Sequence, residues 1–213
     1  MKAVIFDMDG VIVDTMDLHR NAAIKSLSEN GLEVSLEEIK KYDGIKSSEA
    51  FKKFFSSKTD EEIDEMLSKK YEFLRKQVKG IKPFPGFFEF LFRLKGKCPL
   101  AVVSTSRKAF VEYVLEQIGE KDSFKVILGA EDVFRGKPDP EGYIKAAERL
   151  GVKPGDCLVI EDSIVGVKAA KGAGTKCVGV TNTFDKIFLL DADLIVDSLA
   201  EISEEKLRGL FNA

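Results

Sequence analysis

Short apolar runs recur along the 213-residue chain, and they predict the strands of a sheet. The runs cover Ala3–Phe6, Leu100–Val103, Lys125–Leu128, Leu158–Ile160, Cys177–Val180 and Leu194–Val196. Helical patterns over Arg107–Ile118, Pro140–Leu150 and Val165–Ala170 lie between them, and Asp139 is the expected N-cap of the second. Apolar strands that alternate with helices are typical of a parallel sheet covered on both faces, so the pattern predicts a doubly wound, Rossmann-like α/β core.

Residues 16–82 have a different pattern, with helical spacing and no convincing strand. The helix candidates are Leu18–Leu27, Leu36–Tyr42, Glu49–Phe55 and Glu61–Val78. Two helix starts have capping-box spacing, namely Ser35 with Glu38 and Thr59 with Glu62. The block is far too long for a simple crossover between two strands, so we expect a separate all-helical domain inserted after the first strand.

These boundaries divide the chain into a core of residues 1–15 and 83–213 and a helical domain of residues 16–82. The core resumes at the turn-forming stretch Pro83-Phe84-Pro85-Gly86. The two connections, residues 15–17 and 82–86, are therefore the expected hinges between the domains.

Composition and charge narrow the class of protein. The chain is 44% hydrophobic and 32% charged, with a formal net charge of −3, so it has no basic surplus of the kind that drives nucleic-acid binding. No apolar stretch reaches the roughly 18 residues that a membrane helix needs, and the start of the chain does not resemble a signal peptide. Three widely spaced cysteines suggest buried thiols in a reducing compartment, and we expect a cytoplasmic protein.

Two acids follow the first apolar run, in the stretch FDMDGVIVDT. Asp7 and Asp9 are two residues apart, so on an extended chain their side chains point the same way. A calcium loop of the EF-hand type is excluded, because Val11 and Leu18 stand where acidic ligands are required. A simple turn at Asp9-Gly10 remains the alternative explanation.

Polar residues follow the other apolar runs of the predicted sheet. They are Ser104-Thr105-Ser106, Gly136-Lys137-Pro138 and Glu161-Asp162-Ser163. Each group alone fits a helix cap or a solvated loop, but ligands bind beyond the carboxyl ends of the strands in such sheets. Carboxylates, hydroxyls and a lysine at one edge predict a phosphoryl-transfer site with a hard divalent metal such as Mg²⁺.

These motifs, in this order and at these spacings, resemble those of the haloacid dehalogenase superfamily. Over essentially the whole chain the sequence is similar to the β-phosphoglucomutase-like branch, in which a small helical cap is inserted after the first strand. The resemblance implies that Asp7 is a nucleophile that forms an aspartyl-phosphate, while Asp9 protonates the leaving oxygen and then activates water. Asp9 also argues against dehalogenase chemistry, which has no leaving alkoxide to protonate.

The same resemblance implies how the metal and the phosphoryl group are held. Mg²⁺ would bind Asp7, the backbone carbonyl of Asp9 and Asp162, with Glu161 as a further ligand or a residue behind the ligands. Ser104 or Thr105, together with Lys137, would cradle the phosphoryl group.

The cap departs from the pattern of this branch. Its members have a loop of the form Gly-x-x-Arg, whereas Gly44-Ile45-Lys46-Ser47 places Ser47 at the arginine position. Lys46 is an alternative cation, although lysine does not copy a bidentate arginine. His19 falls where sugar-phosphate mutases carry a histidine, or it is a surface helix residue.

We therefore expect a Mg²⁺-dependent phosphatase of small phosphorylated metabolites, present as a monomer or weak homodimer, that binds neither nucleic acid nor membrane. The alternatives are a sugar-phosphate mutase of the β-phosphoglucomutase type and a non-enzymatic receiver domain that accepts phosphate on an aspartate. Receivers are shorter and have no reason to carry an inserted helical domain.

Overall fold

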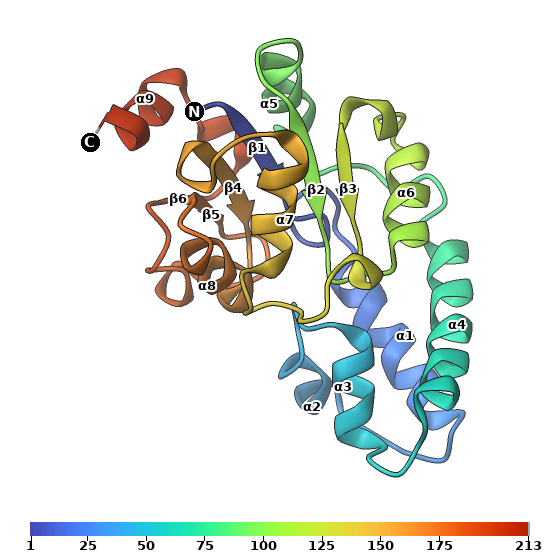
Figure 1. The fold of residues 1–213 in the computed structure, drawn as a ribbon. Helices are drawn as coiled ribbons and strands as arrows, with labels where there is room; N and C mark the ends of the chain where they lie inside the picture. The colour runs from blue at the N-terminus through green and yellow to red at the C-terminus, as the bar shows by residue number, and fades with distance from the viewer. Residues whose placement is uncertain (213) are drawn as a thin grey trace.

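A six-stranded parallel sheet forms the centre of the protein in the computed structural model, which describes residues 1–212 (Figure 1). The strand order is β3-β2-β1-β4-β5-β6, and every neighbouring pair is parallel. The strands are β1 (Ala3–Phe6), β2 (Leu100–Val103), β3 (Val126–Leu128), β4 (Cys157–Glu161), β5 (Lys176–Val180) and β6 (Leu194–Val196). All the predicted strands are present, and the doubly wound core is confirmed.

Helices cover the sheet and fill the insertion between its first two strands in sequence. The α-helices are α1 (Met16–Ser28), α2 (Leu36–Lys40), α3 (Ser47–Phe54), α4 (Asp60–Gln77), α5 (Phe87–Leu94), α6 (Lys108–Gln117), α7 (Glu141–Leu150), α8 (Ile164–Gly172) and α9 (Glu204–Asn212). Short 3₁₀ turns are η1 (Lys121–Ser123), η2 (Ala130–Asp132), η3 (Pro154–Asp156), η4 (Lys186–Phe188) and η5 (Leu199–Glu201). No helix among the described residues is both long and apolar enough to span a membrane.

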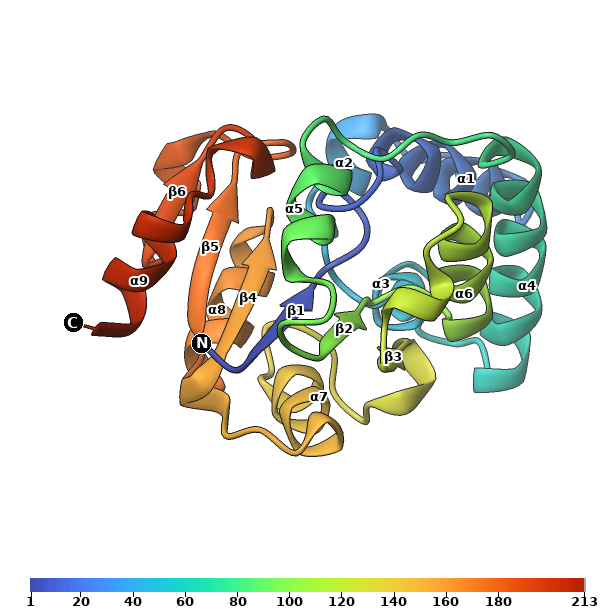
Figure 2. The ribbon, with the colours of Figure 1, turned by 90° about the horizontal axis from the view of Figure 1, so that it is seen from above.

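Alternate residues of the strands pack on opposite faces of the sheet. Val4 and Phe6 belong to a core with α5 and α6, whereas Ala3 and Ile5 belong to a core with α7 and α8. The placement of α5 and α7 on opposite faces is visible from above (Figure 2). Both faces are buried, which explains why strands such as β1 and β2 are apolar at every position rather than at alternate ones.

The helical insertion stands at the carboxyl ends of the strands (Figure 1). Helix α1 packs along α4, and α2 and α3 pack on this pair. Helix α5 also precedes β2, but its Phe87 and Phe90 rings lie 6.1 and 5.9 Å from the ring of Phe6 on the sheet. The all-helical insertion is confirmed, and its exact bounds at residues 16 and 82 stay a prediction.

Local signals account for most helix starts. Both capping boxes form, with Ser35 accepting from the Glu38 N–H and Thr59 from the Glu62 N–H. Helix α7 begins at Glu141, one residue later than predicted, and the Asp139 carboxylate accepts from the Glu141 N–H at 3.0 Å. The predicted N-cap at Asp139 is thus wrong by one residue, because Pro140 itself occupies the cap position.

The Thr59 cap should contribute measurably to stability. Thr59→Ala removes the hydroxyl that accepts from the Glu62 N–H, and we expect a loss of about 1 kcal/mol in the free energy of unfolding. Thr59→Ser, which keeps the hydroxyl, is the matched control and should lose much less. Urea denaturation of both variants measures the difference, and equal stability of wild type and Thr59→Ala would contradict this account of the α4 start.

Candidate active site

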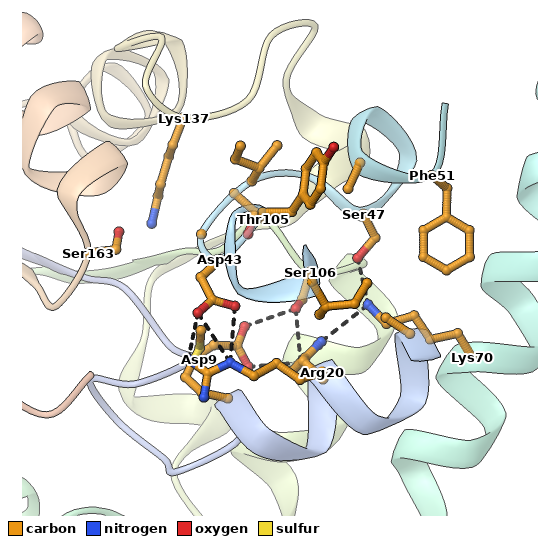
Figure 3. A pocket seen from close by; sticks show the side chains of 18 of the residues that line it. Asp9, Arg20, Asp43, Ser47, Phe51, Lys70, Thr105, Ser106, Lys137 and Ser163 are labelled. Carbon is orange, nitrogen blue, oxygen red and sulfur yellow. Dashed lines mark hydrogen bonds and ion pairs between the residues drawn. The ribbon is translucent and has the colours of Figure 1, made fainter. Parts of the chain in front are cut away.

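A cavity of about 80 Å³ lies where the helical insertion faces the carboxyl end of the sheet (Figure 3). The core contributes acids, hydroxyls and a lysine to its lining, and the insertion contributes residues from all four of its helices, α1 to α4, and from the loop before α3. Its polar lining residues include Asp7, Asp9, Thr105, Ser106, Lys137, Asp162, His19, Arg20, Asp43, Ser47 and Lys70. The predicted acids and lysine therefore meet at one cavity.

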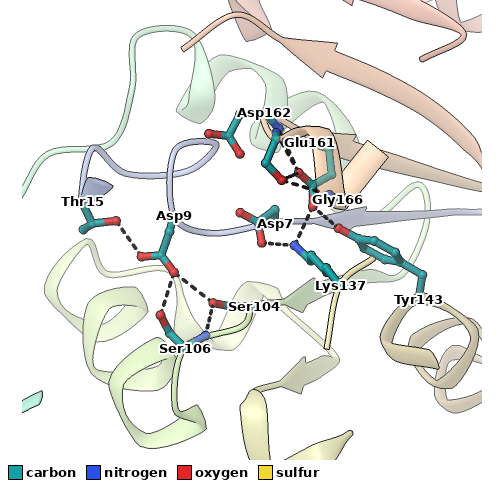
Figure 4. A network of polar contacts seen from close by, with 11 residues as sticks. Asp7, Asp9, Thr15, Ser104, Ser106, Lys137, Tyr143, Glu161, Asp162 and Gly166 are labelled. Carbon is teal, nitrogen blue, oxygen red and sulfur yellow. Dashed lines mark hydrogen bonds and ion pairs between the residues drawn. The ribbon is translucent and has the colours of Figure 1, made fainter. Parts of the chain in front are cut away.

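Lys137 joins two buried carboxylates at the floor of this cavity (Figure 4). Its Nζ lies 2.5 Å from Asp7 Oδ1 and 2.5 Å from Glu161 Oε1. Burial raises the pKa of Asp7 above its usual range, helped by the charges of Glu161 and Asp9, although Lys137 opposes the shift. Burial would lower the pKa of Lys137, but the charges of Asp7 and Glu161 raise it instead. The lysine is therefore a fixed positive charge beside Asp7.

Glu161 is completely buried, and its oxygens are saturated by hydrogen bonds. Oε1 accepts from Lys137 Nζ and from the Tyr143 hydroxyl, both at 2.5 Å. Oε2 accepts from the N–H groups of Asp162 and Ser163 and from the Ser163 hydroxyl. A Cβ at Gly166 would lie 1.9 Å from this carboxylate, so only glycine leaves room for it at the start of α8.

The surroundings of the Asp162 carboxylate differ from those of Glu161. Its Oδ2 is buried and has no hydrogen-bond partner among the described residues. Burial and the charges of Glu161 and Asp7 raise the pKa of Asp162 well above its ordinary value. Gly10, at φ 87°, lets the chain pass over this oxygen, because a Cβ there would lie 1.9 Å from it. An unpartnered carboxylate oxygen that is costly to ionise is what a bound cation would stabilise.

Oxygens of Asp7, Glu161 and Asp162 lie within 4.8 Å of one another, which makes this cluster a possible metal site. The donors are all carboxylate oxygens, which suit a hard divalent ion such as Mg²⁺. Asp162 and Asp7 fit the part of direct ligands. Glu161, whose lone pairs are already used, fits the part of a residue that positions Lys137 and the loop of Asp162.

Asp9 lies on the other side of Asp7 and is held by hydroxyls. Its Oδ1 accepts from Thr15 at 2.6 Å, and its Oδ2 accepts from Ser104 at 3.0 Å and Ser106 at 2.9 Å. Burial would raise the pKa of Asp9, but the charge of His19 and these hydrogen bonds outweigh it, and the pKa falls well below its usual range. Asp9 is ionised as it is held here.

The predicted residues of the helical insertion separate into two groups. His19 faces the site, with Nε2 3.2 Å from Asp9 Oδ1, and Ser47 lines the cavity. Lys46 faces elsewhere, because its stem lies against Gly136 and its Nζ donates to the Val133 carbonyl at 3.1 Å. Lys46 is therefore held away from the cavity in this arrangement.

The sequence motifs did not identify several residues that the structure places at the site. Lys70 of α4 is buried, donates to Ser47 Oγ at 2.6 Å and lies 3.4 Å from His19 Nδ1. Burial lowers the pKa of Lys70 to about 8. Nothing in the α4 pattern distinguishes Lys70 from a solvated lysine. Tyr143 could have been suspected, since it lies on the buried face of the helix that follows Lys137 and Pro138.

Comparison with known proteins assigns the chain to a family. Residues 4–180 match the model of the haloacid dehalogenase-like hydrolases, and the chain belongs to that family. The sequence resemblance described above is thereby confirmed, and the protein is a hydrolase of this family.

Individual relatives include both phosphatases and a mutase. The chain is 30% identical to validoxylamine A 7'-phosphate phosphatase of Streptomyces hygroscopicus subsp. limoneus, with 94% of this chain and 95% of that protein covered. It is 32% identical to β-phosphoglucomutase of Bacillus subtilis, with 97% and 94% covered. Among solved structures, β-phosphoglucomutase from Clostridium difficile matches with a TM-score of 0.90 at 29% identity, over 100% of this chain and 97% of that one.

The acidic cluster predicts a specific response to metal. Mg²⁺ should stabilise the wild-type protein against thermal unfolding. At a Mg²⁺ concentration a hundredfold above Kd, the free energy of unfolding should rise by about 2.7 kcal/mol. Asp162→Asn should stabilise the metal-free protein at neutral pH, because Asp162 must either bury a charge or take up a proton on folding and asparagine does neither. It should also lose most of the response to Mg²⁺. Thermal unfolding with and without Mg²⁺ measures both effects.

Asp156→Asn is the matched control, because Asp156 sits at the opposite end of β4, paired at the surface with Lys2. It should respond to Mg²⁺ as the wild type does. A full Mg²⁺ response in Asp162→Asn would show that the cluster is not the metal site.

Proposed function

We propose that the protein is a Mg²⁺-dependent phosphatase that hydrolyses small phosphorylated metabolites through an aspartyl-phosphate. The observation that carries the proposal is the placement of Asp7: its carboxylate lies at the floor of the cavity, fixed by Lys137 at 2.5 Å and flanked by Asp162. Membership of the hydrolase family and the phosphatase relative support it.

In the first step, an Asp7 carboxylate oxygen attacks phosphorus and the ester P–O bond breaks, with the proton for the leaving oxygen supplied by Asp9. Lys137 neutralises charge on the phosphoryl oxygens and on Asp7, while the hydroxyl of Thr105 is available on the cavity wall. Ser104 acts by holding Asp9 rather than by facing Asp7.

In the second step, Asp9 takes a proton from water, the water oxygen attacks phosphorus, and Asp7 is released as a carboxylate. The ionised Asp9 of this structure is the form needed for that proton abstraction. To act in the first step Asp9 must bind a proton, and its pKa would rise if the His19 charge moved away and the hydrogen bonds to its carboxylate were lost.

Asp7 and Asp162, with the carbonyl of Asp9, would hold the Mg²⁺. When bound, the ion supplies positive charge that orients the phosphoryl oxygens and keeps Asp7 ionised. Glu161 positions Lys137 from behind.

Motion of the helical insertion completes the proposal. Residues 15–17 and 82–86 are the proposed hinges, and the insertion contacts the core through pairs that can separate, such as Arg107 with Asp64 at 2.5 Å. Closure would exclude bulk water during attack, and opening would release the product. A cytoplasmic location and a monomer or weak homodimer stay predictions.

Asp9→Asn should separate general-acid catalysis from the rest of the mechanism. With alkyl phosphates the loss should be large, about 10²-fold to 10⁴-fold, because the leaving alkoxide needs a proton. With p-nitrophenyl phosphate the loss should be smaller, since that leaving group is stable as an anion. Steady-state kinetics on both esters gives the comparison, with Asp7→Asn as the reference that loses both activities. Equal losses on both esters would exclude Asp9 as the general acid.

Mutase activity is the second candidate, and the B. subtilis and C. difficile β-phosphoglucomutases favour it. A mutase must grip the distal phosphate of a bisphosphate and let a sugar hydroxyl, not water, attack the phospho-enzyme. Here Ser47 replaces the cap arginine and Lys46 faces Val133. Loss of charge-assisted hydrogen bonds lowers affinity by roughly tenfold to hundredfold, so water should be the acceptor.

The products formed from β-glucose 1-phosphate with a trace of the 1,6-bisphosphate distinguish the two enzymes. We expect free phosphate to accumulate, with little glucose 6-phosphate. A phosphate assay coupled with glucose 6-phosphate detection follows both. Rapid, bisphosphate-dependent formation of glucose 6-phosphate without release of phosphate would establish the mutase instead.

A further inference from the structure

Arg20 of α1 brings a guanidinium group to the wall of the cavity, although the cap loop itself lacks the arginine of related enzymes. It lies beside Asp43, the residue before the Gly44-Ile45-Lys46-Ser47 loop, and Figure 3 shows the two side chains facing each other. An arginine here could hold a second phosphate on the substrate, unless its charge is already matched.

The Arg20 guanidinium forms ion pairs with two carboxylates. Its Nη2 lies 2.5 Å from Asp43 Oδ2, and its Nε lies 3.2 Å from both Asp43 oxygens. Its Nη1 lies 2.6 Å from Asp17 Oδ1. The side chains of Arg20 and Asp43 are 14% and 7% exposed, whereas that of Asp17 is 81% exposed and therefore well solvated. The Arg20–Asp43 pair is the shielded one.

A second phosphate near this pair would meet Asp43 as well as Arg20. The guanidinium donors that would bind it are directed at carboxylates, and the Asp43 charge repels an anion at close range through a partly dry medium. An uncharged group has no such penalty. Hydroxyls can accept from guanidinium N–H groups and donate to a carboxylate, so a paired arginine and aspartate suit a polyol.

The rest of the wall agrees with an uncharged leaving group. Ala23, Ile39, Phe51 and Phe54 line the same cavity. Lys70 and His19 also bring basic groups from the insertion to the cavity, but both are engaged near the reacting acids. The Lys70 Nζ donates to Ser47 and lies 3.4 Å from His19, which contacts Asp9.

We propose that the Arg20–Asp43 pair determines specificity, by excluding substrates with a second phosphate and favouring monophosphates of uncharged, hydroxylated alcohols. The proposal rests on the phosphatase function proposed above, and it assigns Asp43 the part of masking Arg20. Freeing Arg20 should therefore create affinity for a second phosphate.

Binding to the full-length Asp7→Asn protein with Mg²⁺ tests this without turnover. Isothermal titration calorimetry with fructose 1-phosphate and fructose 1,6-bisphosphate gives the affinity ratio for the second phosphate. The Asp7→Asn protein should bind the bisphosphate no more tightly than the monophosphate. Adding Asp43→Asn, which keeps the shape and removes the charge, should shift the ratio about tenfold toward the bisphosphate.

Two further variants serve as controls. Adding Arg20→Gln to the Asp43→Asn protein should abolish the shift, because no freed guanidinium remains. Asp17→Asn, which removes the solvated partner, should shift the ratio much less than Asp43→Asn. An unchanged ratio in Asp43→Asn, or a shift that survives Arg20→Gln, would overturn the proposal.

If Asp43→Asn does not fold, the binding of both ligands to the Asp7→Asn protein still tests the proposal. Tighter binding of the bisphosphate than of the monophosphate contradicts the proposal. Equal or weaker binding of the bisphosphate supports it. Failure of the phosphatase function is seen separately, as absence of phosphate release from every ester by the wild-type protein. If the wild-type protein releases phosphate but Asp43→Asn leaves the affinity ratio unchanged, only the role of Asp43 is overturned.

Discussion

Lys137 bridges two buried carboxylates, Asp7 and Glu161, and the rest of the active site depends on this bridge. Burying acids at the end of a parallel sheet is unfavourable unless their charges are paired and hydrogen-bonded. The strand order places β1 beside both β2 and β4, so Asp7 and Glu161 emerge from neighbouring strands, and the loop before α7 brings Lys137 between them. One positive charge does not neutralise these acids and Asp162 together, which leaves the cluster ready to accept a cation.

A second ion pair, between Arg20 and Asp43, lines the same cavity from the side of the helical insertion. The two pairs have different consequences. At the floor, the acids outnumber the lysine, which suits a cation, and we propose that this cation and Lys137 together bind the phosphoryl group. In the insertion, Asp43 offsets the Arg20 charge, so this part of the wall presents hydrogen-bonding groups and apolar surface. In the proposed function, such a site would bind one phosphate at the floor and the remainder of the substrate through neutral contacts.

The sequence was sufficient to predict the sheet, the helical insertion and the residues at the strand ends. Strands buried on both faces are continuous apolar runs, and a parallel sheet brings their carboxyl ends together, so Asp7, Lys137 and Asp162 could be grouped without coordinates. The helices α5 and α9 were not predicted. The FFEFLFRL stretch of α5 has helical spacing, with Phe87, Phe90, Leu91 and Leu94 on its buried face, but it is only eight residues long and follows a proline-rich turn. A short apolar run of this length does not distinguish a helix from a strand. Lys70 and the Arg20–Asp43 pair depend on the tertiary packing of separate segments of the insertion, which no local pattern encodes.

We propose that Asp7 receives the phosphate, and trapping the phospho-enzyme tests this assignment without reliance on steady-state kinetics. Wild-type protein would be mixed with Mg²⁺ and a phosphate ester that it turns over, quenched in acid within the first turnover, digested and analysed by mass spectrometry. We expect phosphate on the peptide that contains Asp7, attached through an acyl bond that alkali cleaves. The Asp7→Asn protein should carry no phosphate on this peptide. Phosphate release by the wild type with the label on another residue, or undiminished release by Asp7→Asn, would contradict it.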